Sequence, residues 1–225
     1  MKYDLVIFDL DGTLLNTIED LGTAVNHSLS LRGLPLHSME EYRGKVGHGI
    51  RDLVTKSLPE ELRADASYVD SALKDFREYY SSHIDVHTRP YAGMVKLLED
   101  LHKAGTRIAV ASNKFQEGTE HLVKEFFPEV EFAAIFGNKE GFPLKPDPAI
   151  VELSLKAAGA GKDRAVMVGD SRTDILTAVN GGIGAMVVSW GFRPRQELLD
   201  ALEELSPSGS LADDAEQLRS LLGAI

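Results

Sequence analysis

The sequence contains no cysteine. Disulfide bonds, thiolate metal sites and a thiol nucleophile are therefore excluded. No stretch approaches the roughly 18 consecutive apolar residues that a membrane span needs, and the apolar run near the amino terminus is too short for a secretory signal. We therefore expect a cytoplasmic protein without a membrane partner.

Positive charge is also scarce. The 24 lysine and arginine residues face 35 acidic residues, which gives a formal net charge of −11 at pH 7. The basic residues form no run, and nucleic-acid binding depends on clustered phosphate contacts, so we do not expect a nucleic-acid partner. A small anionic ligand remains possible where local cations or a metal ion offset the acidic charge.

The chain has the length and composition of a globular protein. It contains 225 residues, of which 43% are hydrophobic and 26% are charged. A protein of this size buries roughly 70–75% of its unfolded surface. It is therefore expected to form one large domain or a core that carries an insertion.

The first strong signal is a pair of acidic residues directly after an apolar run. Residues 5–8 read Leu-Val-Ile-Phe, and Asp9 and Asp11 follow. Such a run is typical of a parallel strand that is covered on both faces. Two carboxylates at its end are costly unless a cation or a reaction uses them. Gly12 then lets backbone N–H groups approach a ligand closely.

Further polar residues follow later apolar runs. These residues are Ser112, Asn113, Lys145, Asp170 and Asp174. Neutral donors and an ammonium group suit the oxygens of a phosphoryl group, and backbone amides near Gly12 and Thr13 could form an anion-binding nest. Carboxylate oxygens suit Mg²⁺.

The spacing of the apolar runs predicts an α/β fold with a doubly wound, Rossmann-like parallel sheet. The expected strands are 3–9, 107–111, 132–136, 165–168 and 184–188, with helices between the later ones. A loop is expected over 206–210 and a terminal helix over 214–222. Ligands of such sheets bind at the carboxyl ends of the strands, where every candidate residue falls.

The first connection is far longer than a crossover needs. Residues 14–106 separate the first two strands, whereas a crossover takes about 10–12 residues. The excess has helical periodicity, so we expect an all-helical module at residues 15–85, inserted into a discontinuous core of residues 1–14 and 86–225. The aromatic residues at 76, 79 and 80 are expected in the interior of this module.

The four motifs together resemble the haloacid dehalogenase (HAD) superfamily. Its Asp-x-Asp, Ser or Thr, Lys and paired acids occur here in the family's order between residues 9 and 174. The resemblance implies a hydrolase in which the helical module is a C1 cap that closes over the active site and selects the substrate. The stretches 46–51, 170–172 and 190–192 are similar to phosphoglycolate phosphatase-like members.

The resemblance and the chemistry of the residues suggest roles for the acids. We expect Asp9 to attack phosphorus and form an aspartyl-phosphate, and Asp11 to exchange a proton with the leaving group and then with water. The resemblance implies that Mg²⁺ is bound by Asp9, by the backbone carbonyl of Asp11 and by Asp170. Asp174, one helical turn further on, is expected as an outer or water-mediated contact.

Other residues are expected to bind the substrate or to support the site. The phosphate-binding candidates are Thr13, Ser112, Asn113 and Lys145. His48 and Arg51 are candidates for contacting a substrate carboxylate, while Lys114 and Arg172 are expected as supporting or surface groups. The expected substrate is a small phosphorylated metabolite, phosphoglycolate first among them, and the protein a monomer or a homodimer.

Alternatives stay open at this point. A phosphomutase or a pyrophosphatase could use the same core and motifs. A haloacid dehalogenase needs neither a metal nor the second motif acid, so the presence of Asp11 argues against this activity. A phospho-acceptor signalling module also phosphorylates an Asp beside Mg²⁺, but it lacks a 71-residue insertion and the order Asp-Ser-Lys-Asp.

Overall fold

The computed structural model describes residues 2–223 and contains the expected doubly wound α/β core. Six strands pair in parallel in the order β5-β4-β1-β6-β7-β8. The strands are β1 (Leu5–Phe8), β4 (Arg107–Phe115), β5 (Ala134–Asn138), β6 (Ala165–Gly169), β7 (Gly184–Val188) and β8 (Ser210–Ala212). The prediction of an α/β fold with a parallel sheet is confirmed.

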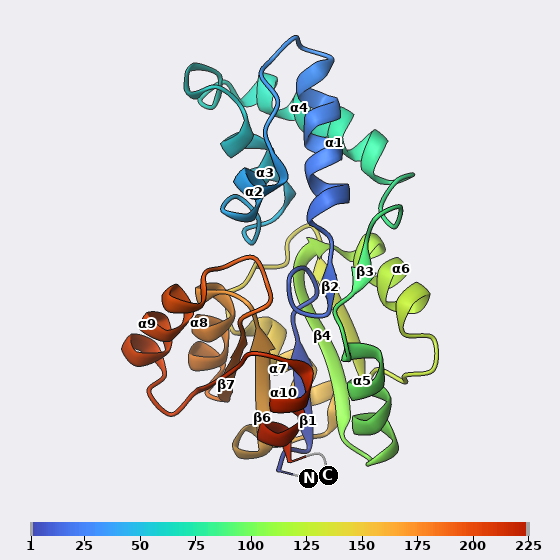
Figure 1. The fold of residues 1–225 in the computed structure, drawn as a ribbon, viewed down its shortest axis with the longest axis vertical. Coiled ribbons are helices and arrows are strands. Elements are labelled where there is room, and N and C mark those ends of the chain that lie inside the picture. The colour runs from blue at the N-terminus through green and yellow to red at the C-terminus, as the bar shows by residue number, and fades with distance from the viewer. Residues whose placement is uncertain (1, 224–225) are drawn as a thin grey trace.

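Helices cover both faces of this sheet (Figure 1). They are α5 (Met94–Lys103), α6 (Gln116–Phe126), α7 (Ala149–Ala158), α8 (Arg172–Gly181), α9 (Arg195–Leu205) and α10 (Ala215–Leu222). Successive side chains of a strand point to opposite faces, so Val6 and Phe8 pack in one apolar core with α5, α6 and α10. Leu5 and Ile7 pack in the other with α7, α8 and α9. The short 3₁₀ helix η2 (Lys162–Arg164) leads into β6.

A separate group of helices lies beyond the carboxyl ends of the strands, at the top of Figure 1. These helices, here called the helical module, are α1 (Ile18–Ser30), α2 (Met39–Arg43), α3 (Ile50–Ser57), η1 (Glu60–Leu62) and α4 (Ala66–Tyr80). Leu21 and Val25 of α1 pack with Leu73 and Phe76 of α4 in one apolar core. The expected helical periodicity is therefore present, and the limits 15–85 remain our proposal for the module.

Two short strands form the stem of the helical module. β2 (Leu15–Asn16) pairs antiparallel with β3 (Arg89–Pro90). Asp20 of α1 reinforces this stem, because its buried carboxylate accepts hydrogen bonds from the backbone N–H groups of His87 and Thr88 and from the Thr88 hydroxyl. The sequence predicted neither this ribbon nor the role of Asp20.

Several element boundaries differ from the prediction, most of all in β4 and β5, and the strand β8 was not predicted. β4 continues to Phe115 through a register shift after Ala111, so the polar residues 112–114 lie on an irregular part of the strand and not in a loop after it. β5 begins two residues later than expected, at Ala134. The edge strand β8 was missed because three residues are too few to show a period.

No helix within residues 2–223 is both long and apolar enough to cross a bilayer.

Candidate active site

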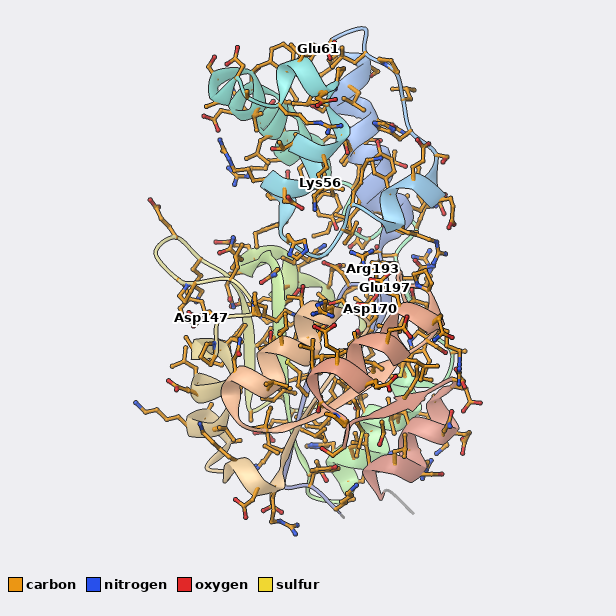
Figure 2. All side chains as sticks on the ribbon, turned by 90° about the vertical axis from the view of Figure 1, so that its left-hand side faces the viewer. Lys56, Glu61, Asp147, Asp170, Arg193 and Glu197 are labelled. Atoms are coloured by element: carbon orange, nitrogen blue, oxygen red, sulfur yellow. The ribbon has the colours of Figure 1, made fainter. Side chains whose placement is uncertain are left out.

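The carboxyl edge of the sheet brings the predicted site residues into one cavity. Asp9 and Asp11 follow β1, Ser112 and Asn113 lie on the end of β4, and Asp170 follows β6. The cavity is lined from the core by Asp9, Asp11, Ser112, Asn113, Lys114, Lys145, Asp170, Ser171, Asp174, Phe192 and Arg193. It lies between the core and the helical module, at the level where Figure 2 labels Asp170 and Arg193.

Three carboxylates meet in this cavity. One oxygen each from Asp9, Asp170 and Asp174 lies within 4.8 Å of the others, and all three residues are buried. Burial, together with the charge of Asp174, raises the pKa of Asp170 to about 7. Burial likewise holds the pKa of Asp9 well above its usual value, against the opposing charge of Lys145. Buried carboxylates that repel one another in this way are typical of a binding site for a hard divalent cation, which prefers oxygen ligands.

Lys145 joins two of these acids. Its Nζ lies 2.8 Å from Oδ1 of Asp9 and 2.7 Å from Oδ1 of Asp174. Burial alone would lower the pKa of the Lys145 ammonium, but the two carboxylates outweigh burial and hold it above its usual value. Oδ2 of Asp174 accepts from the backbone and hydroxyl of Ser171, which caps α8. Asp174 therefore caps a helix, pairs with Lys145 and borders the acid cluster.

Asp11 lies apart from the three-acid cluster and pairs with another lysine. Nζ of Lys114 is 3.1 Å from Oδ1 of Asp11 and 2.5 Å from the hydroxyl oxygen of Tyr80 on α4. Only 1% of the Lys114 side chain is exposed. Of the two roles expected for these residues, supporting or surface group, Lys114 has the supporting one, and Arg172 is a surface group that forms an exposed ion pair with Glu204.

The phosphate-binding candidates differ in what they already bind. Ser112 lines the cavity, and its Oγ accepts from the backbone N–H of Lys114. The amide of Asn113 donates to the carbonyl oxygens of Gly47 and Lys145, and its Oδ1 accepts from the Lys145 N–H. Asn113 thus ties the Lys145 loop to the helical module. Thr13 is buried but is not part of the cavity wall.

Comparison with known proteins identifies the family. The sequence pattern of the family described as haloacid dehalogenase-like hydrolase matches residues 6–188. The chain belongs to the haloacid dehalogenase-like hydrolases.

Named relatives of this hydrolase extend over most of its length. A phosphoglycolate phosphatase of Mesorhizobium japonicum is 34% identical over 213 residues, which cover 94% of this chain and 92% of the relative. One from Pseudomonas syringae is 35% identical and covers 95% of this chain and 82% of the relative. The crystal structure of a candidate phosphoglycolate phosphatase from Lactobacillus delbrueckii superposes with a TM-score of 0.90, at 31% identity and 99% coverage of both chains.

A loop after β7 supports Asp170 of the hydrolase from outside the acid cluster. The backbone N–H of Phe192 donates to Oδ2 of Asp170 at 2.7 Å. Gly12 and Gly191 lie directly against the side chain of Asp170. A Cβ at either position would lie 2.3 Å from an atom of Asp170. These glycines therefore leave room for Asp170 that no other residue type would leave.

The same loop is joined to the helical module by arginines. The guanidinium of Arg193 donates to the backbone carbonyls of Arg43 and Val46, and Arg43 in turn donates to the carbonyl of Gly191. Figure 2 shows Arg193 beside Glu197 and Asp170, where the core faces the module. Arg193 was not predicted as a site residue, although its place just after the similar stretch 190–192 was a signal.

The helical module contributes an apolar wall to the cavity. This wall consists of Leu21, Val46, Gly47, Gly49, Ile50 and Leu53. His48 and Arg51 are not part of it, and Arg51 forms an exposed ion pair with Asp70 instead. The expectation that these two residues contact a substrate in this cavity is therefore not met by the structure.

Proposed function

We propose that this hydrolase is a Mg²⁺-dependent phosphatase of small phosphate monoesters, with phosphoglycolate as its leading substrate. The observation that carries the proposal is the buried group of Asp9, Asp170, Asp174 and Lys145 at the end of β1 and β6. Relatives named phosphoglycolate phosphatase, at 34–35% identity, support the substrate class.

The charges of the cavity support a need for a divalent cation. Its wall contains four carboxylates and only three cations, which are Lys114, Lys145 and Arg193. A phosphate ester dianion adds two negative charges, which these three cations cannot balance while they also face the acids. Asp9, Asp170 and the backbone carbonyl of Asp11 would hold Mg²⁺, with Asp174 at its border. The bound ion supplies the charge neutralisation that lets a carboxylate approach an anionic phosphoryl group.

The chemistry of the residues divides into two steps. The Asp9 carboxylate forms a bond to phosphorus as the ester P–O bond breaks, and the leaving oxygen takes a proton from Asp11. Water then attacks the aspartyl-phosphate and gives its proton to Asp11, so that phosphate leaves and Asp9 is regenerated. Lys145 and the hydroxyl of Ser112 stabilise charge on the phosphoryl oxygens.

The helical module would act as a cap in this scheme. Its apolar wall over the cavity excludes water, and the β2–β3 ribbon is the place where it would pivot. A phosphomutase or a pyrophosphatase must also hold a second phosphoryl group, and the module places no lysine or arginine in the described cavity wall for it.

A rapid-quench experiment with ³²P-labelled phosphoglycolate tests the proposal. We expect steady release of phosphate and label on the peptide that contains Asp9. Phosphate release without label at Asp9 would overturn the covalent mechanism. If no phosphate monoester is hydrolysed in the presence of Mg²⁺, the phosphatase assignment itself is wrong.

A further inference from the structure

The three cations of the cavity differ in which protein groups they contact. Lys145 is shared by the carboxylates of Asp9 and Asp174. Arg193 is engaged by backbone carbonyls of the helical module. Lys114 is buried in the core and faces a single carboxylate, that of Asp11, whereas Lys145 faces two.

A second feature of Lys114 is its set of hydrogen-bond donors. An ammonium group has three N–H donors. Nζ of Lys114 contacts only two residues within 2–223: the Tyr80 hydroxyl at 2.5 Å and both carboxylate oxygens of Asp11, at 3.1 and 3.5 Å. The contact at 3.5 Å is at the limit of a hydrogen bond, so one N–H is held only weakly. The side chain is 99% buried and lines the cavity. A buried donor with so long a contact is open to a better acceptor, and the cavity is where such an acceptor would enter.

The position of Lys114 indicates which part of a substrate it would meet. Lys145 lies beside Asp9, which attacks phosphorus in the proposed mechanism, so Lys145 faces the phosphoryl group. Lys114 lies beside Asp11, which gives a proton to the leaving oxygen. A group within one hydrogen bond of that proton donor lies on the leaving-group side of the ester.

The other side chains around the leaving group are apolar or already paired. Leu21, Val46, Ile50 and Leu53 form the opposite wall. An anionic leaving group would therefore find Lys114 as the cation on its side within the described wall. A single weakly held N–H suits a carboxylate better than a second phosphoryl group, whose three oxygens need several donors.

We propose that Lys114 binds a carboxylate on the leaving group and so makes this hydrolase selective for phosphate esters of short hydroxy acids. The inference rests on the proposed phosphatase function and adds the residue that sets its substrate class. It assigns to a core residue the role that a module residue such as Arg51 was expected to fill.

The wild-type protein provides the first test, with three esters that share the phosphoryl group. Phosphoglycolate, its carboxyl methyl ester and ethyl phosphate are compared by kcat/KM in the presence of Mg²⁺. We expect phosphoglycolate to be preferred by about 10- to 100-fold, the range that one charge-assisted hydrogen bond provides. Equal kcat/KM values for the three esters would overturn the role of Lys114 and leave the phosphatase function intact. The absence of turnover on all three would instead overturn the proposed function.

Substitution of Lys114 provides the second test. Lys114→Met should remove most of the preference, with a fall of about 10- to 100-fold for phosphoglycolate and a much smaller fall for ethyl phosphate. Tyr80→Phe removes a hydrogen bond but no charge, so the preference should persist. Arg51→Met is the matched control outside the cavity and should leave all three values unchanged.

The ratio of the two substrates separates specificity from structural damage. A misfolded or distorted site loses activity on both esters alike, whereas a lost carboxylate contact changes their ratio. An equal loss on phosphoglycolate and ethyl phosphate in folded Lys114→Met would overturn the inference. If Lys114→Met does not fold, the comparison of the three esters with the wild-type protein still tests the inference.

Discussion

Lys145 and Asp9 lie 136 positions apart in the sequence, yet Nζ of the lysine is 2.8 Å from Oδ1 of the aspartate. This pair places a buried ammonium against the proposed nucleophile. It neutralises part of the charge that would repel a phosphate ester, and it holds the Asp9 carboxylate in one position.

Replacement of Asp9 by Asn should abolish turnover while the fold is retained. An amide keeps the size of the side chain but is too weak a nucleophile to attack phosphorus. We expect kcat/KM to fall at least about a thousandfold, equivalent to about 4 kcal/mol of lost transition-state stabilisation. Asp163→Asn, at an exposed site on η2 that is not part of the cavity wall, is the control and should behave as wild type. Near-normal turnover in folded Asp9→Asn would disprove the nucleophile assignment.

Lys145→Met should lower stability as well as activity. Removing the lysine leaves the carboxylates of Asp9 and Asp174 buried without their cation, which costs about 3–5 kcal/mol in comparable buried pairs. Urea unfolding measures the loss, with the exposed neighbour Lys139→Met as the control. Adding Asp174→Asn to Lys145→Met should recover part of the stability, because one unpaired charge is then removed. A double variant no more stable than the single one would contradict this account.

Magnesium should stabilise the protein, and more strongly at pH 8 than at pH 5.5. Burial raises the pKa of Asp170 from 3.8 to about 7 in the folded state. The folded state therefore keeps a proton that the unfolded state loses, so this group lowers the stability of the ion-free protein as pH rises from about 4 to 7. A bound cation needs the deprotonated carboxylate, and it removes this penalty at high pH.

Thermal unfolding with and without EDTA tests the linkage. At a free Mg²⁺ concentration of about 100 Kd, we expect Tm to rise by about 5–10 °C at pH 8 and by less at pH 5.5. EDTA should abolish turnover, and Mg²⁺ should restore it. Asp170→Asn is the matched variant and should lose most of the shift. An equal Mg²⁺ shift at both pH values would show that the buried carboxylates are not the binding site.

Gly12→Ala should disturb Asp170 beyond the ordinary cost of its backbone conformation. Gly12 has φ +88°, and an added Cβ would lie 2.3 Å from Oδ2 of Asp170. Gly33 has φ +64° with no atom within 4 Å of such a Cβ, so Gly33→Ala measures the conformational cost alone, about 1–2 kcal/mol. We expect Gly12→Ala to lose more stability than this and also to lose the Mg²⁺-dependent rise in Tm. Equal effects of the two substitutions would exclude the close approach.

Asp20→Ala should weaken the stem of the helical module. The Asp20 carboxylate is 2% exposed and accepts from the backbone N–H groups of His87 and Thr88. Leaving these buried donors unpaired should cost about 3 kcal/mol in the free energy of unfolding. Its neighbour Glu19 contacts His87 at the surface, at 3.5 Å, so Glu19→Ala should cost less than about 1 kcal/mol. Similar losses for both variants would contradict the assigned role of Asp20.

Much of the core could be predicted because its signals are local. The apolar runs before Asp9, Ser112 and Asp170 each predict a buried strand that is followed by polar residues. β1 and β6 do end there, whereas β4 continues to Phe115. Parallel strands bring their carboxyl ends to one edge, so the meeting of these residues followed from the pattern alone. The edge strand β8 gave no such signal because it has three residues.

The surroundings of individual side chains could not be predicted in this way. Lys114 follows Ser112 and Asn113 directly, but only the fold shows that it is buried against Asp11 and Tyr80. Arg51 lies in the stretch that resembles a specificity loop, yet the phase of α3 places it on the surface with Asp70. A shift of one residue along a helix turns a side chain by about 100°, and the resemblance of a stretch does not fix that phase.

By itself, the amino-acid sequence determined which chemical groups stand at the strand ends and in which order, since these follow from residue type and period. Only the tertiary structure decided that Lys145 pairs with Asp9 and Asp174 while Lys114 pairs with Asp11. The physical reason is that charge interactions and burial depend on distances through space. Those distances are set by the packing of loops and helices that lie far apart along the chain.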